Sequence, residues 1–77
     1  MGNDNFKLIG DIESALLQAQ SMANIALDNH NYKSMGYDEP FITHNNMGNL
    51  LWAITDLINK AYDDLQKIEI KGDANNG

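Results

Sequence analysis

Apolar residues in the first third of the chain recur at the spacing of an amphipathic helix. Their steps are 3, 4, 3, 4 and 3 along Ile9, Ile12, Leu16, Ala19, Ala23 and Ala26. Leu8, Ala15 and Met22 widen this stripe, and no proline interrupts it. Such a period places the apolar side chains on one face of a helix, where they can be buried together. We therefore predict a helix over about 7–28, preceded by a flexible N-terminus at 1–6.

A second and longer stripe occupies the last half of the chain. It consists of Met47, Leu51, Ile54, Ile58, Ala61, Leu65 and Ile68, with Leu50, Leu57 and Tyr62 beside it. Its steps of 4, 3, 4, 3, 4 and 3 predict a helix over about 45–69. Thr43, Asn45 and Asn46 can each accept a capping hydrogen bond at its start.

The connection at about 29–44 is long for a helical hairpin, where about 2 to 8 residues are common. Gly36 and Pro40 interrupt any regular period. The segment nevertheless holds several apolar side chains, namely Tyr32, Met35, Tyr37, Phe41 and Ile42. It either folds back over the two helices or forms a binding surface. The residues after the second helix end in "GDANNG", which predicts a disordered tail at 72–77 and a single hairpin domain at 7–71.

These elements predict an all-α fold, an antiparallel helical hairpin with a long loop that contains aromatic residues. A chain of 77 residues without cysteine has few ways to stabilise a small core. Two helices also leave much of each apolar stripe in contact with water. We therefore expect a homodimer, or a higher oligomer, in which two hairpins form a four-helix bundle. The expected oligomer interface consists of Leu16, Ala19, Ala23, Leu51, Ile54, Ile58 and Leu65.

The single tryptophan falls outside the apolar stripe of its own helix. At 100° per residue, Trp52 lies about 150° from the middle of the stripe, near Asp56 and Asn59. Tyr37 and Phe41 of the loop could cover it, it could anchor a contact with another chain, or it could simply be exposed. Tryptophan is enriched at the energetic centres of protein interfaces. The predicted partner-binding residues are accordingly Trp52, Tyr32, Tyr37 and Phe41.

Charge and composition exclude several classes of ligand. The net charge is −6, and the 5 basic residues are all lysines dispersed among 11 acids. Nucleic-acid binding depends on neutralising phosphates with basic residues, so we expect no direct DNA or RNA ligand. No segment approaches the roughly 18 apolar residues of a membrane span, and no signal peptide is recognisable. The expected location is the cytoplasm, with no membrane partner.

No arrangement of residues predicts catalysis. His30 and His44 are the only imidazoles, and nothing in their spacing requires them to meet a carboxylate. Asp63 and Asp64 are adjacent in sequence and therefore diverge around a helix, which favours a solvated face. No glycine-rich loop matches a nucleotide-binding pattern. We expect no enzyme activity, no catalytic residue, no metal site and no cofactor.

Three functions remain compatible with the sequence. The first is a small, non-enzymatic regulator or adaptor that binds another, unidentified protein and acts as an oligomeric helical scaffold. The second is an acidic decoy from a phage or mobile element that inhibits a nucleic-acid enzyme or defence protein of the host. The third is a protein that sequesters a small ligand at the dimer interface, with Trp52, Tyr37 and His44 against the ligand.

Overall fold

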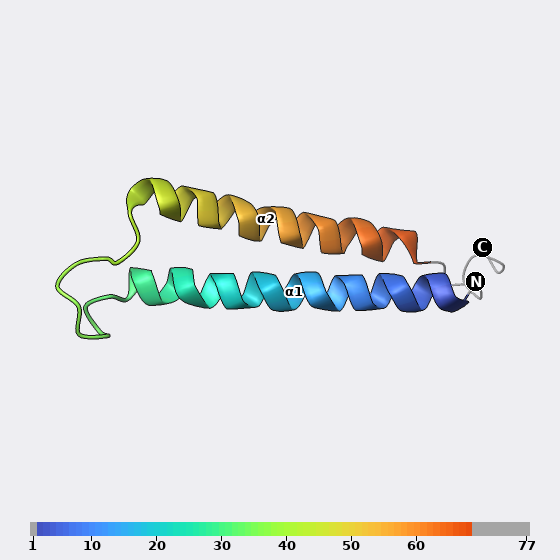
Figure 1. Ribbon diagram of the computed structural model, residues 1–77, viewed down its shortest axis with the longest axis horizontal. Coiled ribbons are helices and arrows are strands. Elements are labelled where there is room, and N and C mark those ends of the chain that lie inside the picture. The colour runs from blue at the N-terminus through green and yellow to red at the C-terminus, as the bar shows by residue number, and fades with distance from the viewer. Residues whose placement is uncertain (1, 69–77) are drawn as a thin grey trace.

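Two long helices pack side by side in opposite directions (Figure 1). The computed structural model describes residues 2–68, with side chains from residue 5 onward. Helix α1 spans Gly2–His30 and helix α2 spans His44–Lys67. The described residues form no strand, so the predicted all-α antiparallel hairpin is confirmed. The molecule is a rod of 58 × 21 × 20 Å.

Both ends of α2 are closed by hydrogen bonds. Thr43 has an extended backbone, and its Oγ1 accepts a hydrogen bond from the backbone N–H of Asn46 at 3.2 Å. This is the capping contact that a hydroxyl residue makes with the free N–H groups of a first turn. At the other end, the backbone N–H of Ile68 donates to the carbonyl oxygen of Leu65 at 3.2 Å. The helix therefore ends at Lys67, close to the predicted end.

Helix α1 starts earlier than the apolar pattern predicts. It begins at Gly2, and not at residue 7 after a flexible segment. An apolar stripe marks the turns that contact another element, whereas helical backbone can continue beyond those turns. The tail predicted at 72–77 lies outside the described residues.

The loop between the helices is held to the end of α1. A turn follows His30, and Gly36 has a φ of 92°, a backbone conformation that glycine adopts without strain. Asn29 is buried, and its Oδ1 accepts a hydrogen bond from the backbone N–H of Ile42 at 2.8 Å. The rings of Tyr37 and Phe41 pack on each other with centroids 5.7 Å apart. The hydrogen bond to Asn29 and the contact between the two rings therefore hold the loop in a defined conformation.

The contact between the helices follows seven positions on each side, which we call the seam. On α1 these are Leu8, Ile12, Ala15, Ala19, Met22, Ala26 and Asn29. On α2 and the residue after it they are Met47, Leu50, Ile54, Leu57, Ala61, Asp64 and Ile68. All fourteen are buried or half-buried. Alanine is prominent at the centre of the seam, where Ala15, Ala19 and Ala61 are buried. Small side chains allow two helices to approach closely.

The seam is rotated relative to the stripes that the sequence pattern predicts. Ile9, Leu16 and Leu65 were expected at the centre of the helix contact, but about half of each side chain is exposed. Leu50 and Leu57, expected at the margin, lie in the seam. Each stripe has apolar residues at three of every seven positions. A helix with a single neighbour can bury only part of so broad a stripe. The periodicity alone does not determine which part is buried.

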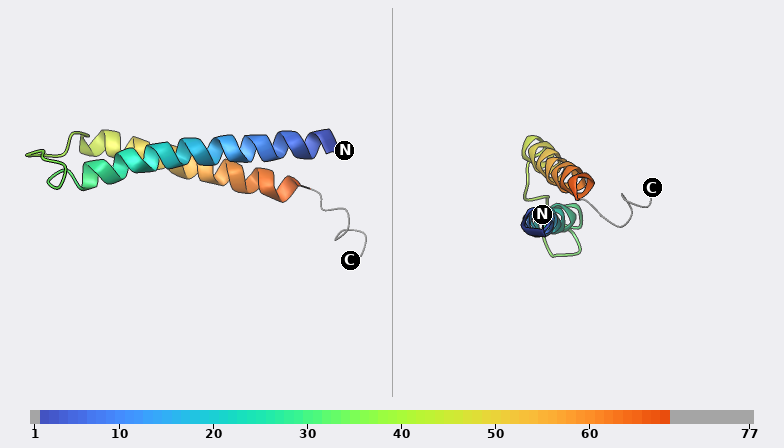
Figure 2. Two further views of the ribbon diagram at one scale, coloured as in Figure 1. Left: turned by 90° about the horizontal axis from the view of Figure 1, so that it is seen from below. Right: turned by 90° about the vertical axis from the view of Figure 1, so that its right-hand side faces the viewer.

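The resulting core is thin. No large side chain among the described residues is fully buried. In the end-on view of Figure 2 the described chain is two helices side by side, with no third element over either side of the pair. The apolar surface that the helices carry therefore exceeds what one hairpin covers.

The hydrogen bond from Ile42 to Asn29 predicts that Asn29→Ala destabilises the hairpin. The substitution removes the acceptor of a part-buried backbone N–H, and such a loss costs about 1–2 kcal/mol. The free energy of unfolding, measured with urea, should fall by that amount. Asn31→Ala is the control, because Asn31 is exposed in the same region. Equal losses in both variants would contradict the role given to Asn29.

Candidate functional site

A row of exposed apolar residues runs along one side of the hairpin. We call it the apolar flank, and it consists of Ile9, Leu16, Ala23, Leu51, Ile58 and Leu65. Each of these residues directly follows a seam residue. Because the two helices run in opposite directions, the residue that follows a seam residue lies on the same side of the hairpin in α1 and in α2. The six residues therefore form one continuous surface that the hairpin leaves uncovered.

The opposite side of the hairpin is mainly polar. A shallow hollow on that side is lined by Asp11, Ser14, Gln18 and Lys60, together with the seam residues Ala15 and Leu57. Ile25 is an exception near the loop, where 46% of its surface is exposed. The two sides thus differ in character. A helix pair that is apolar on one side only is suited to packing against another element through that side.

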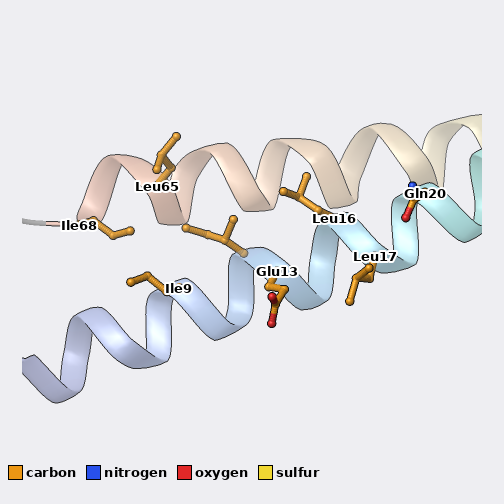
Figure 3. Close-up of a pocket in the computed structure, with 8 residues that line it drawn as sticks. Ile9, Glu13, Leu16, Leu17, Gln20, Leu65 and Ile68 are labelled. Carbon is orange, nitrogen blue, oxygen red and sulfur yellow. The ribbon is translucent and has the colours of Figure 1, made fainter.

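The apolar flank opens into a groove at the end of the hairpin away from the loop (Figure 3). The groove has a volume of about 600 Å³, and its walls are Ile9, Ile12, Glu13, Leu16, Leu17, Gln20, Leu65 and Ile68. Ile9 and Ile68 point toward one another across it, whereas Glu13 points away from α2. An apolar groove of this kind accepts apolar side chains, and its walls provide no set of groups for acid–base chemistry.

Trp52 is exposed over 70% of its surface. It lies on the face of α2 away from the seam, and Gly48, Leu51 and Thr55 line a shallow hollow beside it. The loop aromatic residues do not cover it, so that explanation of its position is wrong for the single chain. Trp52 is available for contact with another molecule.

The other predicted partner-binding residues lie in the loop. Tyr37 and Phe41 are about half exposed and pair with each other. Tyr32 is half-buried, with Lys33 Nζ 6.0 Å from the centre of its ring. Trp52 is eight residues into α2, about two helical turns from the loop. The structure therefore brings the two loop aromatic residues together and places Trp52 apart from them.

The predicted oligomer-interface residues divide into two groups. Ala19 is buried and Ile54 is half-buried, and both belong to the seam within one chain. The remaining five belong to the apolar flank, namely Leu16, Ala23, Leu51, Ile58 and Leu65. These five side chains remain free to meet another molecule.

A buried carboxylate lies in the seam, where the sequence pattern predicts a solvated residue. Only 8% of the Asp64 side chain is exposed. Its oxygens lie 2.9 Å from Lys60 Nζ and 3.7 Å from Lys67 Nζ. The hydrogen bond from Lys60 lowers the pKa of Asp64, the charges of both lysines act in the same direction, and burial opposes them. The two lysines lie one turn before and one turn after Asp64, a spacing that could have indicated the contact.

Residues 2–68 contain neither a candidate metal site nor a helix that could span a membrane. No group of three or more His, Cys, Asp or Glu side chains there is placed to hold a metal ion. Neither helix of this part of the chain is long and apolar enough to cross a membrane. His30 and His44 are both exposed, one at the end of α1 and the other at the start of α2.

Comparisons with protein-family models, with curated proteins and with solved structures found no match to this chain.

The environment of Asp64 predicts a loss of stability in acid. Its pKa in the folded protein is below the ordinary value of about 3.9, so the folded state favours the charged carboxylate. The stabilisation is complete above about pH 4 and disappears as the pH falls through the lower, folded pKa. Asp64→Asn removes the titrating group. The difference in unfolding free energy between the native chain and this variant should therefore shrink from pH 6 to pH 2.

Urea unfolding followed by circular dichroism at each pH measures that difference. Asp63→Asn is the matched control, because Asp63 is exposed on the same turn of α2. A difference that stays constant with pH for Asp64→Asn would rule out the ion pairs as the source of the effect.

Proposed function

We propose that this chain is a non-enzymatic protein-binding scaffold, a small regulator or adaptor whose hairpins associate through the apolar flank into a four-helix bundle. The observation that carries the proposal is the apolar flank itself. Three of its residues lie on α1 and three on α2, on the same side of the hairpin. Apart from Ala23 they are leucines and isoleucines, and each of these five side chains is about half exposed. Exposed apolar surface of this extent is characteristic of interaction sites.

The distribution of apolar positions supports association over a solitary hairpin. Each helix has seam residues at two positions in every seven and apolar flank residues at a third. Three apolar positions in seven are typical of helices that contact two neighbours in a bundle, whereas two in seven suffice for a pair. A second hairpin placed on the flank gives each helix its second neighbour.

Trp52 supports a separate surface for another protein. It lies on the side of α2 turned away from the seam, where 70% of its surface is exposed in the single chain, and it lines a hollow with Leu51 of the apolar flank. A tryptophan side chain has a large contact area and few rotatable bonds, so it loses little conformational entropy when it anchors an interface. The exposed Tyr37 and Phe41 add a second aromatic surface at the loop.

Leu16→Glu should shift the protein from dimer to monomer. A carboxylate on the apolar flank would have to lose its water in the interface without a partner, a strongly unfavourable change. Sedimentation equilibrium at micromolar concentration measures the shift, and we expect at least a 100-fold weaker association. Ile25→Glu is the matched control on the opposite side of the same helix, with 46% of Ile25 exposed against 49% of Leu16.

Equal association of the two variants would place the contact elsewhere. A native chain that sediments as a monomer at all concentrations up to about 100 times that range would refute the bundle. Far-ultraviolet circular dichroism of both variants checks that the helices remain.

Trp52→Ala should weaken capture of a partner protein by roughly 30-fold and leave self-association unchanged. Truncating a central interface tryptophan commonly costs 2 kcal/mol or more, which is roughly a 30-fold loss of affinity. The measurement is quantitative mass spectrometry of proteins retained by the native chain and by the variant. Asn59→Ala is the control, because Asn59 is exposed one heptad further along the same helix. Equal recovery with Trp52→Ala would eliminate the role of this residue.

A further inference from the structure

We infer that the occupant of the apolar flank is a second copy of this chain in antiparallel orientation, so that α1 lies on α1 of the second copy and α2 on its α2. The inference rests on the proposed self-association and adds its orientation and register. The twofold axis crosses the rod at the level of Leu16 and Ile58. The two loops then lie at opposite ends of the bundle.

The dimensions of the hairpin are sufficient for a stable dimer. A specific interface buries about 800 Å² on each partner. One whole side of the rod, 58 Å long and 20 Å wide, exceeds that area. The apolar flank covers only part of this side, because Ile9 to Ala23 on α1 and Leu51 to Leu65 on α2 each extend over about 21 Å. The interface therefore also includes residues on either side of the flank. A second copy also matches the flank in length, because it presents the same row of residues.

The midpoint of α1 favours this register. Helix α1 spans Gly2–His30, so its midpoint is Leu16, which is also the central flank residue of that helix. An antiparallel pair centred on Leu16 therefore overlaps α1 over its full length. Ile9 then lies level with Ala23 of the second copy, because both are seven residues from the centre.

The sizes of the flank residues distinguish the antiparallel from the parallel arrangement. In the antiparallel dimer, each outer layer of the bundle contains one isoleucine, one alanine and two leucines from Ile9, Ala23, Leu51 and Leu65. In the parallel dimer, one outer layer would contain two isoleucines and two leucines, and the opposite layer would contain two alanines and two leucines. The antiparallel dimer fills both layers equally, which avoids a cavity at the loop end and crowding at the groove.

The absence of cysteine from the sequence allows the orientation to be tested by disulfide formation. The variants are Leu16→Cys, Ile58→Cys, Ile9→Cys and Ala23→Cys, each made alone and incubated in a glutathione redox buffer. A disulfide requires Cα atoms about 4.4–6.8 Å apart. In the antiparallel dimer, Leu16→Cys and Ile58→Cys each cross-link to themselves, and a mixture of Ile9→Cys with Ala23→Cys gives the mixed disulfide. We expect each of these products in at least tenfold excess over a mixed disulfide between Leu16→Cys and Ile58→Cys.

The parallel arrangement gives the reverse result, because it stacks α1 on α2 of the second copy. Predominance of the mixed disulfide between Leu16→Cys and Ile58→Cys would overturn the orientation and leave the proposed scaffold intact. A dimer in sedimentation with no cross-link at any of these positions would overturn the use of the apolar flank. A monomer in sedimentation would overturn the proposed self-association as well. Ile25→Cys, on the opposite side, should not cross-link.

Discussion

The architecture of this protein depends on a mismatch between the width of its apolar stripes and the number of neighbours that each helix has. Each helix carries apolar residues at three positions in every seven, but the hairpin gives it one neighbour. The central positions pack because alanines at Ala15, Ala19 and Ala61 let the helices approach closely. A single neighbour covers only part of so broad a stripe, so the third line of apolar residues remains at the edge of the contact and forms the apolar flank.

Polar residues occupy two positions of the seam and find partners within the chain. Asn29 is buried at the loop end and accepts the hydrogen bond from Ile42, which holds the loop against the end of α1. Asp64 is buried toward the other end and lies near Lys60 and Lys67 of its own helix. Because a buried polar group is costly unless it has such a partner, these contacts allow both residues to lie in the seam. Neither residue requires a second chain.

The sequence was sufficient to predict the hairpin but not the line along which it closes. The regular spacing of Leu51, Ile54 and Ile58 identified a helix, because only helical backbone brings such positions to one face. The choice between Leu57 and Ile58 as the buried neighbour depends on how closely α1 approaches, which is a property of both helices together. Asp64 was expected in solvent because its charge disfavours burial, and two lysines one turn away reverse that preference. The early start of α1 could not be predicted from the apolar pattern, because residues 2–5 contain no apolar side chain of the stripe.

The position of Trp52 follows from the same geometry. The seam uses one face of α2 and the apolar flank an adjacent one, and Trp52 lies on the side far from the seam, where it contributes little to the packing of the hairpin. An exposed tryptophan there gives no folding stability that would offset its tendency to promote nonspecific association. Its exposed fraction of 70% is therefore better explained by an external contact than by the stability of the hairpin. Self-association and partner binding would then use different faces of one helix, so that substitutions can separate the two properties.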